Sequence, residues 1–438
     1  MQIIKPNADL HYGTYVLRIK SALVGPTDSP QECTCVLSQY FMPRPRLSLV
    51  VTPSGDNTNA LISSIFVDTE EQLHLLMLPD GTEITLINDM ASRDAVGFSP
   101  EQEPLQILPA SDRIKNISFS CLNWPLFHRR NAAYLPDGTT LSLTADGWSI
   151  GIRPADDAKK RLELLGDAGG FITTHIGTLA RGDGSTFTTD DVRRLTCVLH
   201  FFFAFSLGAR TGPCLMRGED SDGLPRYLEI GLGQVTPDLV SMHSSWVDSN
   251  HPEQMEELFP LFLQTMARDP WRKAINDTLY WYLSANRLGG GVHVDSALVF
   301  ILTGLELLAW TTLVIDRKVL SKSQFKRGSA SQRVRQLMTH FGIPTEIPIS
   351  LPSLISQAKR VGGDADLPHV LVSMRNDLVH PETMHETVDG AYYEAWRAGQ
   401  WAIEMVLLAV MEYRGTYGNR TRRRSVGEVE SVPWVEPA

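Results

Sequence analysis

The sequence predicts an α+β protein in which a β-rich, antiparallel N-terminal region precedes an all-helical C-terminal bundle. Short alternating or β-branched runs fill the first part of the chain, helical spacing begins near position 188, and from about position 269 helical segments follow one another without strands. We therefore expect a β-rich recognition or sensor domain at 1–165, a mixed helix and strand connecting region at 166–268, a helical bundle at 269–415 and a disordered tail at 416–438.

Composition is that of an ordinary soluble chain with room for two or three domains. Of the 438 residues 43% are hydrophobic and 21% charged, and the net charge of −10 excludes a protein that coats nucleic acid over its whole surface. Cys33 and Cys35 lack a second cysteine pair at zinc-ligand spacing. We expect reduced thiols, a cytoplasmic protein without a signal peptide, no metal and no cofactor.

The N-terminal strands are predicted from runs of alternating or branched residues that turns such as Asp146-Gly147 separate. Strands at this spacing, with no helical pattern between them, favour an antiparallel sandwich or a barrel-like sheet. No residue in this region stands out chemically, and its scattered histidines are interpreted as ordinary surface or core residues. The runs occupy residues 15–19, 47–51, 62–67, 73–77 and 83–87.

The connecting region is predicted to contain two helices. Residues 188–191 supply capping side chains for a helix over 192–207 that ends before Gly208. Its aromatic run, 201–205, is interpreted as core packing rather than as a platform for stacking bases. A second, amphipathic helix over 252–269 contains Pro260, which we expect to kink or split it.

The C-terminal region is predicted to be a bundle of helices near 271–288, from Asp295 onward, at 353–361, ahead of Pro381, and at 389–413. The stretch 297–315 is apolar enough to be considered as a membrane span. Glu306 lies in its middle, where a carboxylate costs about 2.5–3.5 kcal/mol on insertion scales. A central helix of a soluble bundle is therefore the preferred interpretation, with no membrane contact.

A basic connection follows this apolar helix. Residues 316–335 contain seven basic residues and one acidic residue, a net charge of +6 in an acidic protein. Contact with an RNA backbone and an ordinary solvated face are equally compatible with this pattern. The candidate RNA-binding residues are Lys318, Lys322, Lys326, Arg327, Arg333 and Arg335.

The candidate catalytic residues are Arg375, Asn376 and His380, at the predicted end of the helix before Pro381. Asn376 and His380 are four positions apart and share a helical face, while Arg375 is rotated by about 100° and has a long side chain. Cleavage of a phosphodiester needs a cation for the non-bridging oxygens and a group that transfers protons, and Arg and His supply them.

Arg375-Asn376-x-x-x-His380 resembles the R-x4-6-H signature of HEPN domains, small helical bundles that include metal-independent ribonucleases. The preceding apolar helix and the following amphipathic helix are similar in order to the bundle of ApeA-like bacterial HEPN proteins, which carry a large domain in front. The resemblance covers about residues 270–415. It implies that Glu306 pairs with Arg375 as a supporting residue, and that two copies dimerise through the bundle to bring both motifs to one cleft.

The resemblance implies a metal-independent endoribonuclease of phage defence that leaves a 2′,3′-cyclic phosphate, works as a cytoplasmic homodimer, and responds to a phage-derived or cellular trigger at its N-terminal region. A second possibility is a non-catalytic HEPN module that binds RNA or a partner protein, with the motif helix used for packing. A metal-dependent nuclease fits poorly, because no spaced cluster of Asp, Glu and His is present.

Overall fold

The computed structural model describes residues 14–25, 31–40, 46–53, 74–77, 83–91, 96–100, 104–128, 140–233, 235, 245–287, 293–362, 365–380, 382 and 386–435. Two compact units are present. The first comprises residues 1–126, 147–196 and 212–239, and the second comprises residues 127–146, 197–211 and 240–438. The described strands belong mainly to the first unit and most described helices to the second, which confirms the α+β class.

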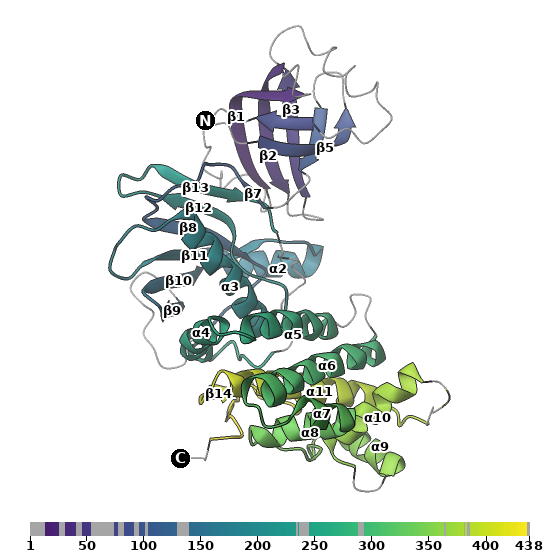
Figure 1. Ribbon diagram of the computed structural model, residues 1–438. Coiled ribbons are helices and arrows are strands. Elements are labelled where there is room, and N and C mark those ends of the chain that lie inside the picture. Colours follow the sequence, from purple (N-terminus) through teal and green to yellow (C-terminus); the bar gives the residue numbers. More distant parts are fainter. Residues whose placement is uncertain are drawn as a thin grey trace. The chain divides into compact units, whose positions relative to one another are not determined.

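The N-terminal strands form a closed antiparallel barrel with the order β1-β2-β3-β6-β5-β4 (Figure 1). Side chains on β2 and β3 alternate, and Cys33, Cys35 and Leu49 are among those that point into its interior. The two thiols lie 3.5 Å apart and form no disulfide. Four of the five expected runs fall in strands, and 62–67 lies outside the described residues. The strands are β1 (Thr14–Gly25), β2 (Gln31–Tyr40), β3 (Arg46–Pro53), β4 (His74–Met77), β5 (Glu83–Ala91) and β6 (Val96–Pro100).

A second sheet has the order β7-β13-β12-β8-β11-β10-β9. On β11, Gly177 lies opposite Phe119 of β8, whose ring occupies the space that a Cβ atom at position 177 would need. At the hairpin between β9 and β10, Asp146 and Gly147 both have positive φ, as their turn signal predicts. The strands are β7 (Leu105–Gln106), β8 (Asn116–Leu122), β9 (Leu141–Ala145), β10 (Trp148–Pro154), β11 (Thr173–Arg181), β12 (Cys214–Glu219) and β13 (Pro225–Ile230).

This sheet corrects the expected domain boundary at residue 165. Strand β8 pairs with β11 and with β12, so strands on both sides of that boundary share one set of backbone hydrogen bonds. The intervening segment is helix α2 (Ala158–Ala168). The sequence pattern missed this continuity because pairing between distant strands leaves no local signal.

Helix α3 (Thr189–Leu207) begins and ends as its capping residues predict. The Thr188 N–H donates to the Asp191 carboxylate at 3.0 Å, and the Asp191 N–H donates to the Thr188 hydroxyl at 3.1 Å. The first of these bonds is the main reason that the pKa of Asp191 is lowered to about 2. Phe202, Phe203 and Phe205 are fully buried, so the aromatic run forms core as expected.

The second unit is built on a helical bundle in which α4, α5, α6, α9, α10 and α11 lie where helices were expected (Figure 1). Helices α7 and α8 lie in the basic connection, for which no separate helices were predicted. Pro260 lies inside an uninterrupted α4, so it does not split this helix. The elements are α4 (Glu253–Met266), α5 (Trp271–Asn286), α6 (Val294–Trp310), the π-helical turn η2 (Thr311–Asp316), α7 (Lys322–Arg327), α8 (Ala330–His340), α9 (Pro352–Gly362), α10 (Leu367–Val379), α11 (Ala391–Val410), β14 (Thr416–Tyr417) and β15 (Glu430–Ser431).

Helix α6 is the central helix of the bundle and packs against α5, α8, α10 and α11. Among the described residues, only Val294–Asp316 forms a helix long and apolar enough to cross a membrane, and 61% of its most apolar window is buried in the protein. Where α11 crosses it, Gly399 faces Ile301, whose Cγ2 atom would lie 2.6 Å from a Cβ atom at position 399. Such burial and close contact are expected of a core helix.

The expectation of a disordered tail is wrong. Residues 416–435 are folded, and Arg420 enters the bundle, where its guanidinium lies 2.8 Å from the fully buried Glu404. Tyr282 donates to the same carboxylate oxygen at 2.6 Å. Other tail arginines also meet carboxylates: Arg422 pairs with Glu430, and Arg424 lies near Asp248. A basic run indicates disorder only where its charges lack folded partners, and here the bundle and the tail itself supply them.

Candidate functional site

The candidate site is built on α10, whose ends are set by local sequence. The Asp366 carboxylate accepts a hydrogen bond from the His369 N–H at 3.0 Å and so caps the first turn, which contains Pro368. Leu371 and Met374 are buried on the inner face. The helix ends at Val379, as expected, and His380 leaves it with φ −130° while its N–H donates to the Asn376 carbonyl at 2.8 Å.

Glu306 of α6 joins two arginines from two other helices. One carboxylate oxygen lies 3.3 Å from Nη2 of Arg375 on α10, and the other lies 3.1 Å from Nη1 of Arg333 on α8. The pairing of Glu306 with Arg375 is therefore present, and the second partner was not foreseen. One negative charge between two positive charges leaves the cluster with a net charge of +1.

The three side chains of this cluster are partly shielded from solvent. Glu306 is 29% exposed, and Arg333 and Arg375 are each 22% exposed. A carboxylate in an otherwise apolar helix is tolerated here because both of its oxygens meet guanidinium groups. The ion pair with Glu306 orients the Arg375 guanidinium, and the Arg375 side chain is not fully buried.

The remaining motif residues differ in their exposure. Asn376 is half-buried, and His380 is exposed at the end of the helix. Asp377 is buried at 7% exposure. Burial raises the pKa of Tyr392, and the negative charge of Asp377 adds to this shift. The helix thus presents Arg375 and Asn376 at its half-buried edge and His380 at its exposed tip.

The basic connection divides into structural and exposed residues. Arg333 donates from Nε to the Phe325 carbonyl at 2.9 Å, and its guanidinium lies over the Phe325 ring. Arg335 holds Asp366 with two nitrogens. The exposed residues, which make no ion pair within the described part of the chain, are Lys318, Lys322, Lys326 and Arg327.

The pair between Arg335 and Asp366 links α8 to the capped end of α10. Burial by itself would raise the pKa of Asp366, but hydrogen bonds from Arg335 and the His369 N–H outweigh it, so the pKa lies below its ordinary value. Helix α8 therefore contacts both ends of the candidate site, through Arg335 at the cap of α10 and through Arg333 at Glu306.

Sequence reasoning placed Arg333 on an RNA-binding surface and did not connect it to the motif. Arg333 and Glu306 are 27 residues apart, and the pairing depends on how α8 packs on α6. The capping boxes that start α7 at Ser321 and α8 at Ser329 were the only local signals of where these helices begin. Within the described ranges no group of His, Cys, Asp and Glu is arranged to hold a metal ion.

The two folded regions match two family models. Residues 109–237 match the model described as the YopA central domain, and residues 268–431 match the model described as the YopA C-terminal domain. The first match covers most of the second sheet, from β8 to β13, and the second covers helices α5 to α11 together with β14 and β15. Both matches agree with a sheet that crosses residue 165 and with a folded C-terminal segment.

The chain is also similar to a whole protein, the SPbeta prophage-derived uncharacterized protein YopA of Bacillus subtilis (strain 168). It is 28% identical over 284 residues, which cover 63% of this chain. The match spans 61% of the length of that protein. No solved structure matches the chain.

Proposed function

We propose that the protein is a metal-independent endoribonuclease of the HEPN type, in which Arg375, Asn376 and His380 act on RNA in a dimeric site. The setting we propose is the bacterial cytoplasm and defence against phage, with a phage-derived or cellular trigger acting at the N-terminal region. The prophage origin is that of the Bacillus relative, and it supports a phage context for this protein.

The observation that carries the proposal is the arrangement of Arg375. Its guanidinium lies 3.3 Å from Glu306 while the Arg375 side chain as a whole remains 22% exposed, five positions before the exposed residue His380. A guanidinium held in advance binds a phosphate at a smaller cost in side-chain entropy than a mobile one. Imidazole is the side-chain group that most readily accepts and donates protons near neutral pH.

The reaction follows from these groups. His380 of one subunit accepts the proton of a ribose 2′-hydroxyl as the 2′-oxygen attacks the adjacent phosphorus. Arg375 stabilises the charge that develops on the non-bridging oxygens. The 5′-oxygen leaves and takes a proton from the imidazolium of the other subunit. The products are a 2′,3′-cyclic phosphate and a 5′-hydroxyl end, and Asn376 orients the imidazole or the phosphate.

A second candidate function is a non-catalytic module that binds RNA or a partner protein. The observation that favours it is the position of the Glu306 carboxylate between Arg333 and Arg375. Glu306 neutralises part of the positive charge that would stabilise an anionic phosphorane. Under this alternative the cluster stabilises packing among α6, α8 and α10, and the four exposed basic residues carry any RNA contact.

RNA cleavage in EDTA separates the two candidates. The full-length protein is incubated with transfer RNA and with bulk transcripts, beside the variants Arg375→Ala and His380→Ala, and product ends are identified by mass spectrometry. Loss of a general acid–base group is expected to slow cleavage by about 10²- to 10⁴-fold. Matched controls are His369→Ala, an exposed histidine at the other end of α10, and Arg360→Ala, which is 50% exposed on α9.

The nuclease proposal requires cleavage by the wild type and by both controls, cyclic phosphate ends, and loss of cleavage in both motif variants. Cleavage that persists in His380→Ala, or that depends on a divalent metal, would overturn it. Wild-type protein that binds RNA without cleaving it, with phage extract added as a trigger, would favour the binding module.

A further inference from the structure

A pocket lies where the chain leaves the central helix, between this segment and α8. At η2 the Arg317 N–H donates to the Thr312 carbonyl at 2.9 Å, a spacing of five residues that widens the last turn of the helix. The chain then folds back, and the Leu320 N–H donates to the Leu313 carbonyl at 2.9 Å. Lys318 makes this reversal with φ +52°, a left-handed conformation that is uncommon for a residue with a side chain.

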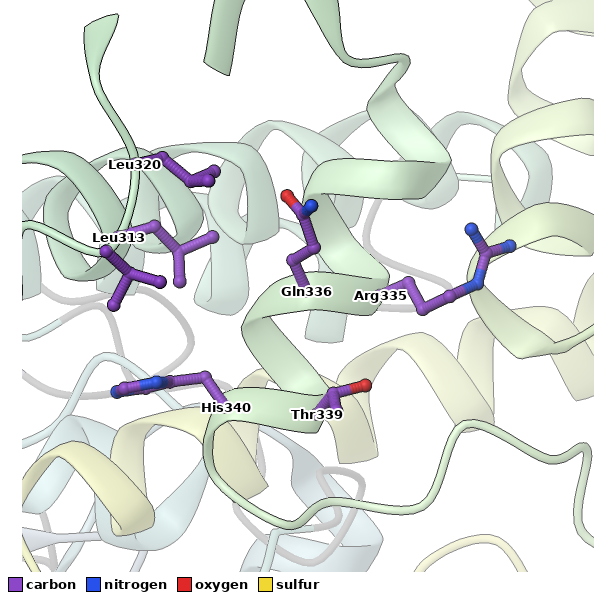
Figure 2. Close-up of a pocket in the computed structure, with 7 residues that line it drawn as sticks. Leu313, Leu320, Arg335, Gln336, Thr339 and His340 are labelled. Carbon is purple, nitrogen blue, oxygen red and sulfur yellow. The ribbon is translucent and has the colours of Figure 1, made fainter. Parts of the chain in front are cut away.

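The reversal forms an open pocket of about 310 Å³ between the returning chain and α8. Figure 2 shows Leu313, Leu320 and His340 on one side of α8, and the amide of Gln336 extends from the helix beside them, near the level of Leu320. The guanidinium of Arg335 points to the opposite side, towards its partner Asp366, so only the rest of that side chain belongs to the lining. The lining consists of Leu313, Val319, Leu320, Arg335, Gln336, Thr339 and His340.

Cationic groups flank this apolar pocket. Lys318 is exposed and directly precedes Val319 of the lining. Arg317 is close enough to His340 for its positive charge to lower the pKa of the imidazole, after burial, which is the larger cause. The Arg317 guanidinium lies 3.4 Å from Asp316 and 3.7 Å from Glu412, and the Arg317 side chain remains 40% exposed. The imidazole is therefore neutral near neutral pH and presents an aromatic face rather than a charge.

The pocket is tied firmly to the motif helix. Helix α8 carries Gln336 and His340 of the lining, and it also carries Arg333 and Arg335, which pair with Glu306 and with the cap of α10. A strand of RNA that reached Arg375 would therefore meet the pocket at a fixed position. Phe325 anchors the intervening α7 through ring contacts with Trp310 at 5.1 Å.

We propose that this pocket binds an unpaired nucleobase between the leucines and the imidazole of His340, with the attached phosphate against Lys318 and Arg317. A base has a flat apolar face that stacks on aromatic rings and an edge that pairs with an amide such as that of Gln336. A purely apolar ligand would use neither the amide nor the flanking cations. That the base belongs to an RNA strand rests on the proposed function. A free nucleotide presents the same base and phosphate and could occupy the same pocket.

Equilibrium binding to the full-length protein tests the inference independently of cleavage. The probe is a labelled 2′-O-methyl hexanucleotide, which lacks the reactive 2′-hydroxyl, compared with the same sugar-phosphate chain without bases. His340→Ala is expected to weaken binding of the first probe by about five- to a hundredfold, the range for loss of base stacking. His340→Phe keeps a stacking face and is expected to restore most of the affinity. His369→Ala, also exposed but not part of the lining, is the control.

Two further measurements distinguish a base within RNA from the base of a free nucleotide. Competition with adenosine monophosphate measures binding of a free nucleotide, and Lys318→Ala should weaken both ligands because both carry a phosphate. A mononucleotide that binds as tightly as the hexanucleotide, in a way that depends on His340, supports the pocket with a free nucleotide as its ligand. Tighter binding of the hexanucleotide supports RNA.

Equal affinity for the chains with and without bases, or full affinity in a His340→Ala protein that melts at the wild-type temperature, would overturn the pocket inference. Neither result depends on catalysis. Conversely, the wild-type protein could fail to cleave RNA while His340→Ala abolishes its base-dependent binding. That result would support the pocket inference and contradict only the nuclease proposal.

Discussion

Replacement of Glu306 by Gln separates the structural role of the arginine cluster from a role in binding RNA. Glutamine keeps the volume of the side chain and one acceptor oxygen, but it removes the charge that holds Arg333 and Arg375 at 3.1 and 3.3 Å. Exposed ion pairs contribute about 0.2–1 kcal/mol each, so the two pairs, whose side chains are 22–29% exposed, should together contribute about 0.4–2 kcal/mol. The free energy of unfolding is expected to fall by that amount in urea denaturation.

Binding should respond in the opposite direction. The substitution raises the charge of the cluster from +1 to +2, because two arginines remain and the carboxylate is gone. If Arg375 contacts phosphate, affinity for single-stranded RNA should increase at low salt, and the slope of log K against log salt should steepen by up to about 0.7, the value for one further phosphate contact. Fluorescence anisotropy between low and moderate salt measures this slope.

Two results would refute this reasoning. An unchanged or weaker affinity together with the expected loss of stability would show that the guanidinium serves packing only. An unchanged stability would show that the two ion pairs contribute nothing. The double variant Glu306→Gln with Arg375→Gln, together with the two single variants, forms a double-mutant cycle. This cycle measures the coupling energy between Glu306 and Arg375 separately from the pairing of Glu306 with Arg333.

Three other substitutions test the surroundings of the site. Arg420→Ala leaves the fully buried Glu404 without its cation and should destabilise the protein by about 3–5 kcal/mol in denaturant titration. Gly399→Ala forces a Cβ atom to within 2.6 Å of Ile301 and should cost about 1–3 kcal/mol. Because the pKa of Asp366 is lowered in the folded protein, its stabilising effect is present above its ordinary pKa and is lost as the pH falls below that value. Asp366→Asn should therefore flatten the loss of stability as the pH falls below about 4, measured as the melting temperature.

Two of these substitutions have a matched comparison. Arg423 is exposed in the same tail as Arg420, and Arg423→Ala should leave stability within about 0.5 kcal/mol of the wild type. Gly166 lies in α2, and no atom lies within 4 Å of the place that a Cβ atom would take there, so Gly166→Ala should stabilise the protein by about 0.5–1 kcal/mol. A destabilised Arg423→Ala, or a tolerated Gly399→Ala, would contradict the packing described for the bundle.

Local chemistry made most of the helices predictable. The capping pair of Thr188 and Asp191 marks the start of α3, and Gly208 follows its end with φ +67°. The periodic apolar residues of α10 and the expected stop after Val379 placed the motif at a helix tip. These features depend on side chains within one or two turns of each other, so the sequence contains the information directly.

Long-range pairing was predictable only in part. The pair between Glu306 and Arg375 was expected from a family resemblance, whereas Arg333 as a second partner was not. The C-terminal arginines were expected to be disordered, although Arg420 is 4% exposed inside the bundle. A charge run looks the same in sequence whether its partners are water molecules or carboxylates from distant segments.

By itself the sequence determined the α+β class, the strand-rich and helix-rich halves, and the Arg375-to-His380 motif at the end of a helix, because periodicity and capping act over a few residues. Only the tertiary structure decided that β8 and β11 share a sheet, that Glu306 joins two arginines, and that the returning chain after η2 forms an open pocket with His340. The physical reason is that these contacts join residues far apart in the chain, and their free energy is realised only after helices and strands pack.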